Sequence, residues 1–203
     1  MLSPSFDLIL RRSKLIILSG FVFAVAAFLI TLLFPLEYRA DAQVLIISRS
    51  RYGVDPYTVV KSAERVGENI AQIVKTNDFF NKVFVQPGYN LDRARFENID
   101  DRTKRKRWEK AIDASVVYGT GVLNISGYST NKDQASQLAA AASNALVSSG
   151  WEYVGGDVSI KLVNDPIVTR FPARPNMVVN VVAGFLLGVV VLSLVILRKG
   201  RQV

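Results

Sequence analysis

Two long apolar stretches dominate the pattern of hydrophobic and polar positions along the chain. Residues 15–34 and residues 177–197 contain no charged side chain. At a helical rise of about 1.5 Å per residue, each stretch is about 30 Å long, the thickness of the hydrocarbon core of a bilayer. A core helix of a soluble domain normally keeps a polar face, which neither stretch has. The pattern therefore predicts two transmembrane helices.

The charges beside these stretches predict how the chain crosses the membrane. Basic residues precede the first stretch and follow the second: Arg11, Arg12 and Lys14, then Arg198, Lys199 and Arg201. Because basic residues in short flanking segments stay in the cytoplasm, both termini are expected inside. We therefore divide the chain into a cytoplasmic tail (1–14), a first span (15–34), an extracytoplasmic domain (35–176), a second span (177–197) and a cytoplasmic tail (198–203).

A cleaved signal peptide is the alternative explanation of the first stretch. Ala40-Asp41-Ala42 resembles a signal-peptidase site. The apolar stretch is, however, longer than the roughly 7–15 residues of a signal peptide. We therefore expect a retained span.

The first half of the middle domain predicts one strand followed by helices. Apolar and polar residues alternate over residues 38–46, which is typical of a strand. Asp55 and Pro56 are a helix N-cap and first helical residue, and an amphipathic pattern follows to about Asn77. A second helix is expected from Asp78 to just before Pro87, and the polar stretch 98–110 is also expected to be helical.

The second half predicts more strands around one long helix. Residues 112–117 and 122–128 are two short β-rich runs, which form either a hairpin or one bulged strand. Residues 131–148 place alanines and leucines on one helix face, and Gly150 is expected to cap its end. Alternation at Val158, Ile160 and Leu162 predicts a last strand. The expected fold class is α+β, with helices on one face of a sheet.

Composition narrows the chemistry that this chain can perform. The sequence is 50% hydrophobic and 21% charged, has a formal net charge of +8, and contains neither cysteine nor histidine. A disulfide, a thiolate nucleophile, a cysteine zinc site and an imidazole base are thereby excluded. The acidic residues Asp100, Asp101, Glu109 and Asp113 lie among cations that would hold them ionised, so they would be poor general acids. We expect no catalytic site, no cofactor and no metal.

The densest charge cluster lies within the stretch 98–110. It consists of Arg102, Lys104, Arg105, Lys106, Arg107 and Lys110, with Trp108 among them. A solvated helix surface is one interpretation, and electrostatic contact with an acidic glycan or a lipid headgroup is the other. Trp108 belongs either to the core or to a surface that stacks on a sugar ring. Nucleic acid is not expected as a partner, since the cluster is predicted to lie outside the membrane.

Prolines and glycines mark two further candidate sites. Pro166, Pro172 and Pro175 lie in the juxtamembrane segment 165–176, where they are expected to end the last strand and to stiffen the connection. A direct role in partner docking is the alternative. Gly184 and Gly188 form a small-xxx-small pair in the second span, which permits close helix packing with the first span or with a neighbouring subunit.

Taken together, these segments resemble the polysaccharide co-polymerase family, the Wzz-type chain length determinants and their capsule and exopolysaccharide adaptor relatives. The resemblance lies in the proline-spaced segment before a glycine-containing second span, in Tyr38-Arg39-Ala40-Asp41-Ala42 after the first span, and in the entry to the long helix at Ser129-Thr130-Asn131. Thr169 stands where a further proline is common. The short domain, without a G-x-x-x-x-G-K-[ST] motif, resembles the small adaptor-type members.

The resemblance implies a non-enzymatic regulator of the length, polymerisation or export of O-antigen, capsule or exopolysaccharide. It implies a homo-oligomer in the cytoplasmic (inner) membrane, working with a polysaccharide polymerase and lipid-linked glycan machinery. An adaptor for a separate tyrosine autokinase is the alternative within the family. A two-span extracytoplasmic sensor or binding module is the alternative of another class.

Overall fold

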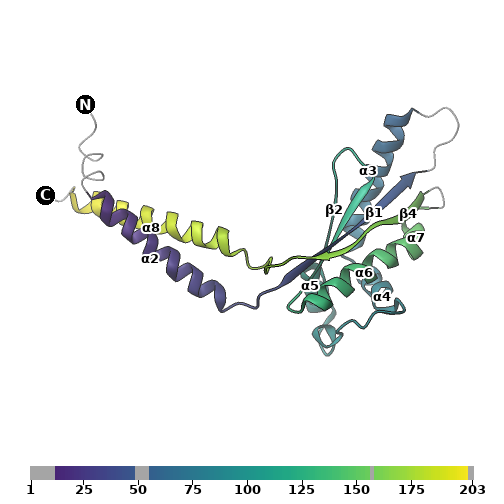
Figure 1. The fold of residues 1–203 in the computed structure, drawn as a ribbon, viewed down its shortest axis with the longest axis horizontal. Helices are drawn as coiled ribbons and strands as arrows, with labels where there is room; N and C mark the ends of the chain where they lie inside the picture. Colours follow the sequence, from purple (N-terminus) through teal and green to yellow (C-terminus); the bar gives the residue numbers. More distant parts are fainter. Residues whose placement is uncertain (1–11, 49–54, 156–157, 201–203) are drawn as a thin grey trace. The chain divides into compact units, whose positions relative to one another are not determined.

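The computed structural model describes residues 12–48, 55–155 and 158–200. Arg11, Arg201 and most of the two expected tails lie outside these ranges. The chain divides into two compact units, one formed by Met1–Leu36 with Ala173–Val203 and the other by Glu37–Pro172. Figure 1 shows the helices and strands of each unit along the chain.

The first unit is a pair of apolar helices. Helix α2 (Ser13–Leu32) and helix α8 (Met177–Gly200) are both long and apolar enough to cross a membrane. Ser19 contacts Gly188 whereas Thr31 contacts Asn180, so the two helices run antiparallel. Their large apolar side chains are mostly exposed, as expected for surfaces that would face lipid.

The second unit contains a sheet built from both halves of the domain. In the described part of the chain, β1 (Tyr38–Ser48), β2 (Ile112–Val116), β3 (Val122–Ser129) and β4 (Val158–Val168) form one sheet of order β2-β3-β1-β4. Every neighbouring pair is antiparallel. The two β-rich runs are therefore a hairpin, which resolves the alternative that the sequence left open.

The end of β4 corrects one expectation. Pro166 was expected to stop the last strand, but β4 continues through it to Val168. Proline is tolerated because β4 is an edge strand and because the pairing is irregular there: Asp41 pairs with Ile167 and Gln43 with Asn164. Asp165 and Pro166 of β4 thus lie opposite the single residue Ala42 of β1. Two residues opposite one define a β-bulge.

Helices cover one face of this sheet. Helix α3 (Pro56–Ile73) begins at the N-cap Asp55, and α4 (Asn77–Val85) begins at the N-cap Thr76. The first helix ends earlier than expected because the Thr76 hydroxyl donates to the Ile73 carbonyl and accepts from the Phe79 N–H. A short 3₁₀ turn, η1 (Ala94–Phe96), precedes α5 (Asp101–Ala111), which Asp100 caps.

Helix α6 (Lys132–Ser149) is the central helix of the domain, and it lies along the sheet in Figure 1. Its predicted apolar face is fully or almost fully buried, from Ala135 to Leu146. The helix approaches β3 so closely that a Cβ at Gly127 would lie 2.9 Å from both the Ala135 carbonyl oxygen and the Ala139 nitrogen. Only glycine fits there without a shift of the helix.

Gly150 ends α6 as expected, but for a different physical reason. Its φ is −64°, so the left-handed conformation of a typical glycine cap is absent. A Cβ at this position would overlap the Leu146 carbonyl oxygen and lie 2.5 Å from the Ile160 side chain, so the backbone of α6 together with the approach of β4 requires glycine. The chain then makes a single helical turn, α7 (Trp151–Val154), before β4.

These elements confirm the expected fold class. The chain is a mixed α+β protein with a four-stranded sheet and two apolar helices near its two ends. The main core lies between the sheet and the helices and contains the aromatic side chains Phe79, Phe80, Phe96 and Trp108.

Candidate functional site

The two predicted packing glycines lie where α8 meets α2. A Cβ at Gly184 would lie 2.6 Å from the Ala27 Cβ, and one at Gly188 would lie 2.7 Å from the Ser19 carbonyl oxygen. Gly20 on α2 is equally restricted, by Phe185. The small residues of both helices therefore share one contact face, as in close-packed membrane helices.

Polar side chains add hydrogen bonds within this helix pair. The Ser19 hydroxyl donates to the Gly188 carbonyl at 3.1 Å, and the Asn180 amide donates to the Thr31 hydroxyl at 3.1 Å. Thr31 in turn donates to the Ala27 carbonyl at 2.7 Å. In lipid, such bonds satisfy polar groups that have no water to bind.

The juxtamembrane prolines occupy three different settings. Pro166 lies within β4, and Pro172 ends the second unit. Pro175 follows a cis peptide bond from Arg174. The prolines are thus not one regular extended run, and their stiffening or docking role stays a prediction.

The basic cluster lies on α5, whose turns distribute the charges around its axis. Arg105 pairs with Glu109 at 3.0 Å, and Arg107 donates to the Arg95 carbonyl at 2.7 Å. Lys104 turns toward the core side, where its ammonium lies 4.4 Å from the centroid of the Phe80 ring. The remaining cations Arg102, Lys106 and Lys110 are exposed.

Trp108 is not part of a glycan-binding surface. It is completely buried, and its indole N–H donates to the Val74 carbonyl at 2.8 Å. The Phe80 ring meets it edge-on at a centroid distance of 5.1 Å. Trp108 is therefore a core residue that holds α5 against the rest of the domain, and the sugar-stacking interpretation is removed.

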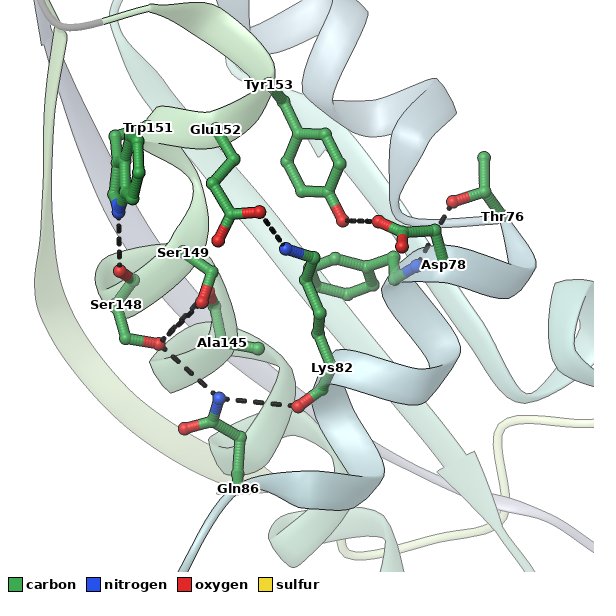
Figure 2. A network of polar contacts seen from close by, with 11 residues as sticks. Thr76, Asp78, Lys82, Gln86, Ala145, Ser148, Ser149, Trp151, Glu152 and Tyr153 are labelled. Carbon is green, nitrogen blue, oxygen red and sulfur yellow. Dashed lines mark hydrogen bonds and ion pairs between the residues drawn. The ribbon is translucent and has the colours of Figure 1, made fainter.

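A network of polar contacts fastens α4 to the end of α6 and to α7 (Figure 2). Lys82 pairs with Glu152, and its ammonium also lies 5.1 Å from the centroid of the Tyr153 ring. The Tyr153 hydroxyl donates to the Asp78 carboxylate. Gln86 donates to the Ser148 hydroxyl at 3.4 Å.

Burial raises the pKa of Tyr153 well above its usual value, and the hydrogen bond to Asp78 raises it further. The phenol therefore stays protonated and acts as a hydrogen-bond donor. With every charge in the network matched by a partner, this arrangement connects α4 to α6 and α7 and presents no activated base or nucleophile.

A second polar contact fixes the β2–β3 turn. The Glu64 side chain on α3 accepts from Lys61 at 3.0 Å and from the Gly119 N–H at 3.5 Å. The hydrogen bond from Lys61 lowers the pKa of Glu64, and the Gly119 N–H lowers it further. Lys61 also lies over the ring of the exposed Tyr118 in this turn.

Sequence reasoning missed both polar contacts. The pair Asp78 and Lys82, four residues apart on α4, was a visible signal that these side chains share a helix face. Their partners Glu152 and Tyr153 lie in a single helical turn that no periodicity reveals. Contacts between residues so far apart in the sequence form only when the tertiary fold brings their helices together.

The chain therefore has an α+β domain between two apolar helices that are long enough to cross a membrane, the arrangement of a two-span membrane protein.

Comparison with known families agrees with this class. The family model Wzz, chain length determinant protein, matches residues 6–86, a range that covers α2, β1, α3 and α4. The match lies in the first half of the chain and confirms the resemblance to the polysaccharide co-polymerase family seen in the sequence. The two spans and this family fit a protein of the inner membrane. No curated protein matches the chain.

Proposed function

We propose that this protein is a non-enzymatic membrane regulator of the chain length, polymerisation or export of a cell-surface polysaccharide. The single observation that carries the proposal is the match of residues 6–86 to the chain length determinant family. The domain between two apolar helices supports it, since the regulator must stay at the membrane where the polymer grows.

In this proposal both termini lie in the cytoplasm, and the domain 35–176 lies outside, beside the growing glycan. Subunits assemble into a homo-oligomer next to a polysaccharide polymerase and its lipid-linked substrates. The regulator makes and breaks no bonds. Its oligomer geometry and its contacts with the polymer set how far the chain grows.

Deletion of the gene tests this function directly. Surface polysaccharide from wild-type, deleted and complemented cells is separated by size on a gel. The proposal expects a changed size distribution or amount after deletion and its restoration by the complementing gene. Identical profiles in all three strains would refute it.

A further inference from the structure

A pocket in the domain combines aromatic walls with two cations. Its volume is about 390 Å³, within the size range of small-molecule sites. Phe80 and Phe84 of α4 and Phe96 of η1 form its apolar wall, with ring centroids 4.4–5.6 Å apart. We call it the α4–α5 pocket.

Charged and polar side chains also line the pocket. Arg93, Lys104 and Glu97 line it, and the exposed Asn81 adds an amide. Within the ranges that the structure describes, neither Arg93 nor Lys104 forms an ion pair. Two cations against one carboxylate give the lining a net positive charge.

Both cations are held in place by the aromatic wall. Lys104 lies 4.4 Å from the Phe80 centroid, and the Arg93 guanidinium lies 5.6 Å from the Phe84 centroid. Arg93 also donates to the Phe84 carbonyl at 2.6 Å. This bond uses one of five guanidinium N–H donors, so the others can bind an anion.

We propose that the α4–α5 pocket binds an acidic sugar residue of a polysaccharide. The carboxylate of the sugar lies between Arg93 and Lys104, Asn81 and Glu97 bind its hydroxyls, and its C–H face lies on Val85, the exposed apolar side chain of the lining. A simple anion would use the cations but leave the exposed Val85 side chain and the Asn81 amide without a role. The inference rests on the proposed function, which brings a polysaccharide to this domain.

Binding to the full chain in nanodiscs tests the pocket. The probe is an oligogalacturonide, compared with a malto-oligosaccharide of equal length and with a polyaspartate of equal charge, by isothermal titration calorimetry. We expect the oligogalacturonide to bind at least tenfold more tightly than either comparison. Equal affinity for polyaspartate would overturn the proposal, because it would mean recognition of charge alone, and so would absence of oligogalacturonide binding.

Matched variants connect that binding to the pocket. Lys104→Gln is expected to weaken oligogalacturonide binding about tenfold, whereas Lys106→Gln removes the same charge from an exposed position on α5 outside the pocket and leaves the affinity within about twofold. Equal effects of the two variants would overturn the proposal.

Two further variants alter the pocket in different ways. Val85→Trp narrows it at a position 77% exposed, where a large side chain does not disturb the core, and is expected to weaken binding without a change of charge. Glu97→Gln removes a negative charge that repels the carboxylates of the oligogalacturonide, and it is expected to tighten binding severalfold. Unchanged affinity of both variants, with thermal unfolding curves like those of the parent protein, would overturn the proposal.

The polysaccharide gel separates this inference from the proposed function. If gene deletion changes the polysaccharide but pocket variants bind oligogalacturonide like the parent protein, only the pocket is refuted. If deletion changes nothing, the proposed function fails whatever the binding result.

Discussion

At the scale of single residues, Trp108 shows how one buried polar atom fixes a helix. The indole of Trp108 is completely buried, and its N–H meets the Val74 carbonyl at the end of α3. The chemistry that makes tryptophan suitable here, a large apolar surface with one donor, also makes it suitable for sugar stacking at a surface. Residue type alone therefore left both interpretations open, and burial decided between them.

Trp108→Phe is expected to destabilise the domain by about 1–3 kcal/mol. The substitution removes the donor to Val74 and leaves a buried carbonyl unpaired next to a small void. Thermal and denaturant unfolding of the full chain in detergent, followed by far-UV circular dichroism, measures the change. Trp151→Phe is the control, since Trp151 is 59% exposed and should shift stability by less than about 0.5 kcal/mol. Equal effects would contradict the assigned core role.

The contact between Glu64 and the β2–β3 turn predicts a pH dependence. The hydrogen bond from Lys61 lowers the pKa of Glu64 in the folded chain, whereas the unfolded value is about 4.3. A lowered carboxyl pKa adds stability above the unfolded pKa, and this stability is lost as the pH falls through the folded pKa.

Glu64→Gln is therefore expected to lower the melting temperature at pH 7, with the difference from the parent protein shrinking toward pH 3. Thermal unfolding of both proteins at pH 7, 5 and 3.5 gives the comparison. Glu68→Gln, at an exposed position on the same helix, should produce no such convergence. A constant gap at all three pH values would show that the ionised form of Glu64 does not support the fold.

At the scale of elements, periodic patterns and helix caps were enough to predict most of the fold. Asp55 was expected to cap α3 and does so, accepting from the Thr58 N–H at 3.3 Å. The alternation in β1 and the apolar face of α6 also matched, because both patterns report burial directly. The last strand was also predicted, but its continuation through Pro166 was missed, since a bulge on an edge strand depends on the partner strand.

The candidate sites show the same difference between features that a local pattern predicts and features that depend on the packing of several elements. The spacing of Gly184 and Gly188 predicted a close-packed helix face, and the structure turns both toward α2. The polar network that joins α4 to α6 and α7 was not predicted, because it combines side chains from elements far apart in the sequence. The α4–α5 pocket was not predicted either, because its lining comes from three consecutive elements whose packing no single periodic pattern reveals. Only the order in which helices stack on the sheet brings these groups together.

The packing of α2 on α8 predicts a crosslink within one chain. The parent sequence has no cysteine, so Thr31→Cys with Asn180→Cys places two thiols where the parent side chains are hydrogen-bonded. Oxidation in membranes should give a disulfide within the monomer, seen by non-reducing gel and by mass spectrometry of the linked peptides. Adding Gly188→Leu should reduce its yield, because a side chain there would push the helices apart.

The control for this experiment is the pair Val22→Cys and Val190→Cys. Both positions are more than half exposed, and no crosslink within the monomer is expected. Crosslinked dimers in place of monomers for the Thr31 and Asn180 pair would mean that the glycine face serves contact between subunits.

At the scale of the whole molecule, the membrane orientation decides whether the domain can meet a surface glycan. The basic residues on the outer flanks of the two spans favour cytoplasmic termini, since moving several cations across the bilayer during insertion is costly. Because the chain would cross the membrane once before the domain and once after it, the domain then lies on the side of the membrane opposite to the termini. The function proposed here requires that side to be the exterior.

Single-cysteine labelling tests this orientation without background, because the parent chain has no cysteine. Ser115→Cys, at an exposed position of β2, is expected to react with a membrane-impermeant maleimide in intact spheroplasts. Ser13→Cys, at the start of α2, should react only after the membrane is permeabilised. The reverse result would place the domain in the cytoplasm, where neither the basic lining of the α4–α5 pocket nor any other surface of the domain could touch an exported polymer. Chain-length control by direct contact would then be physically excluded, however the polysaccharide responds to gene deletion.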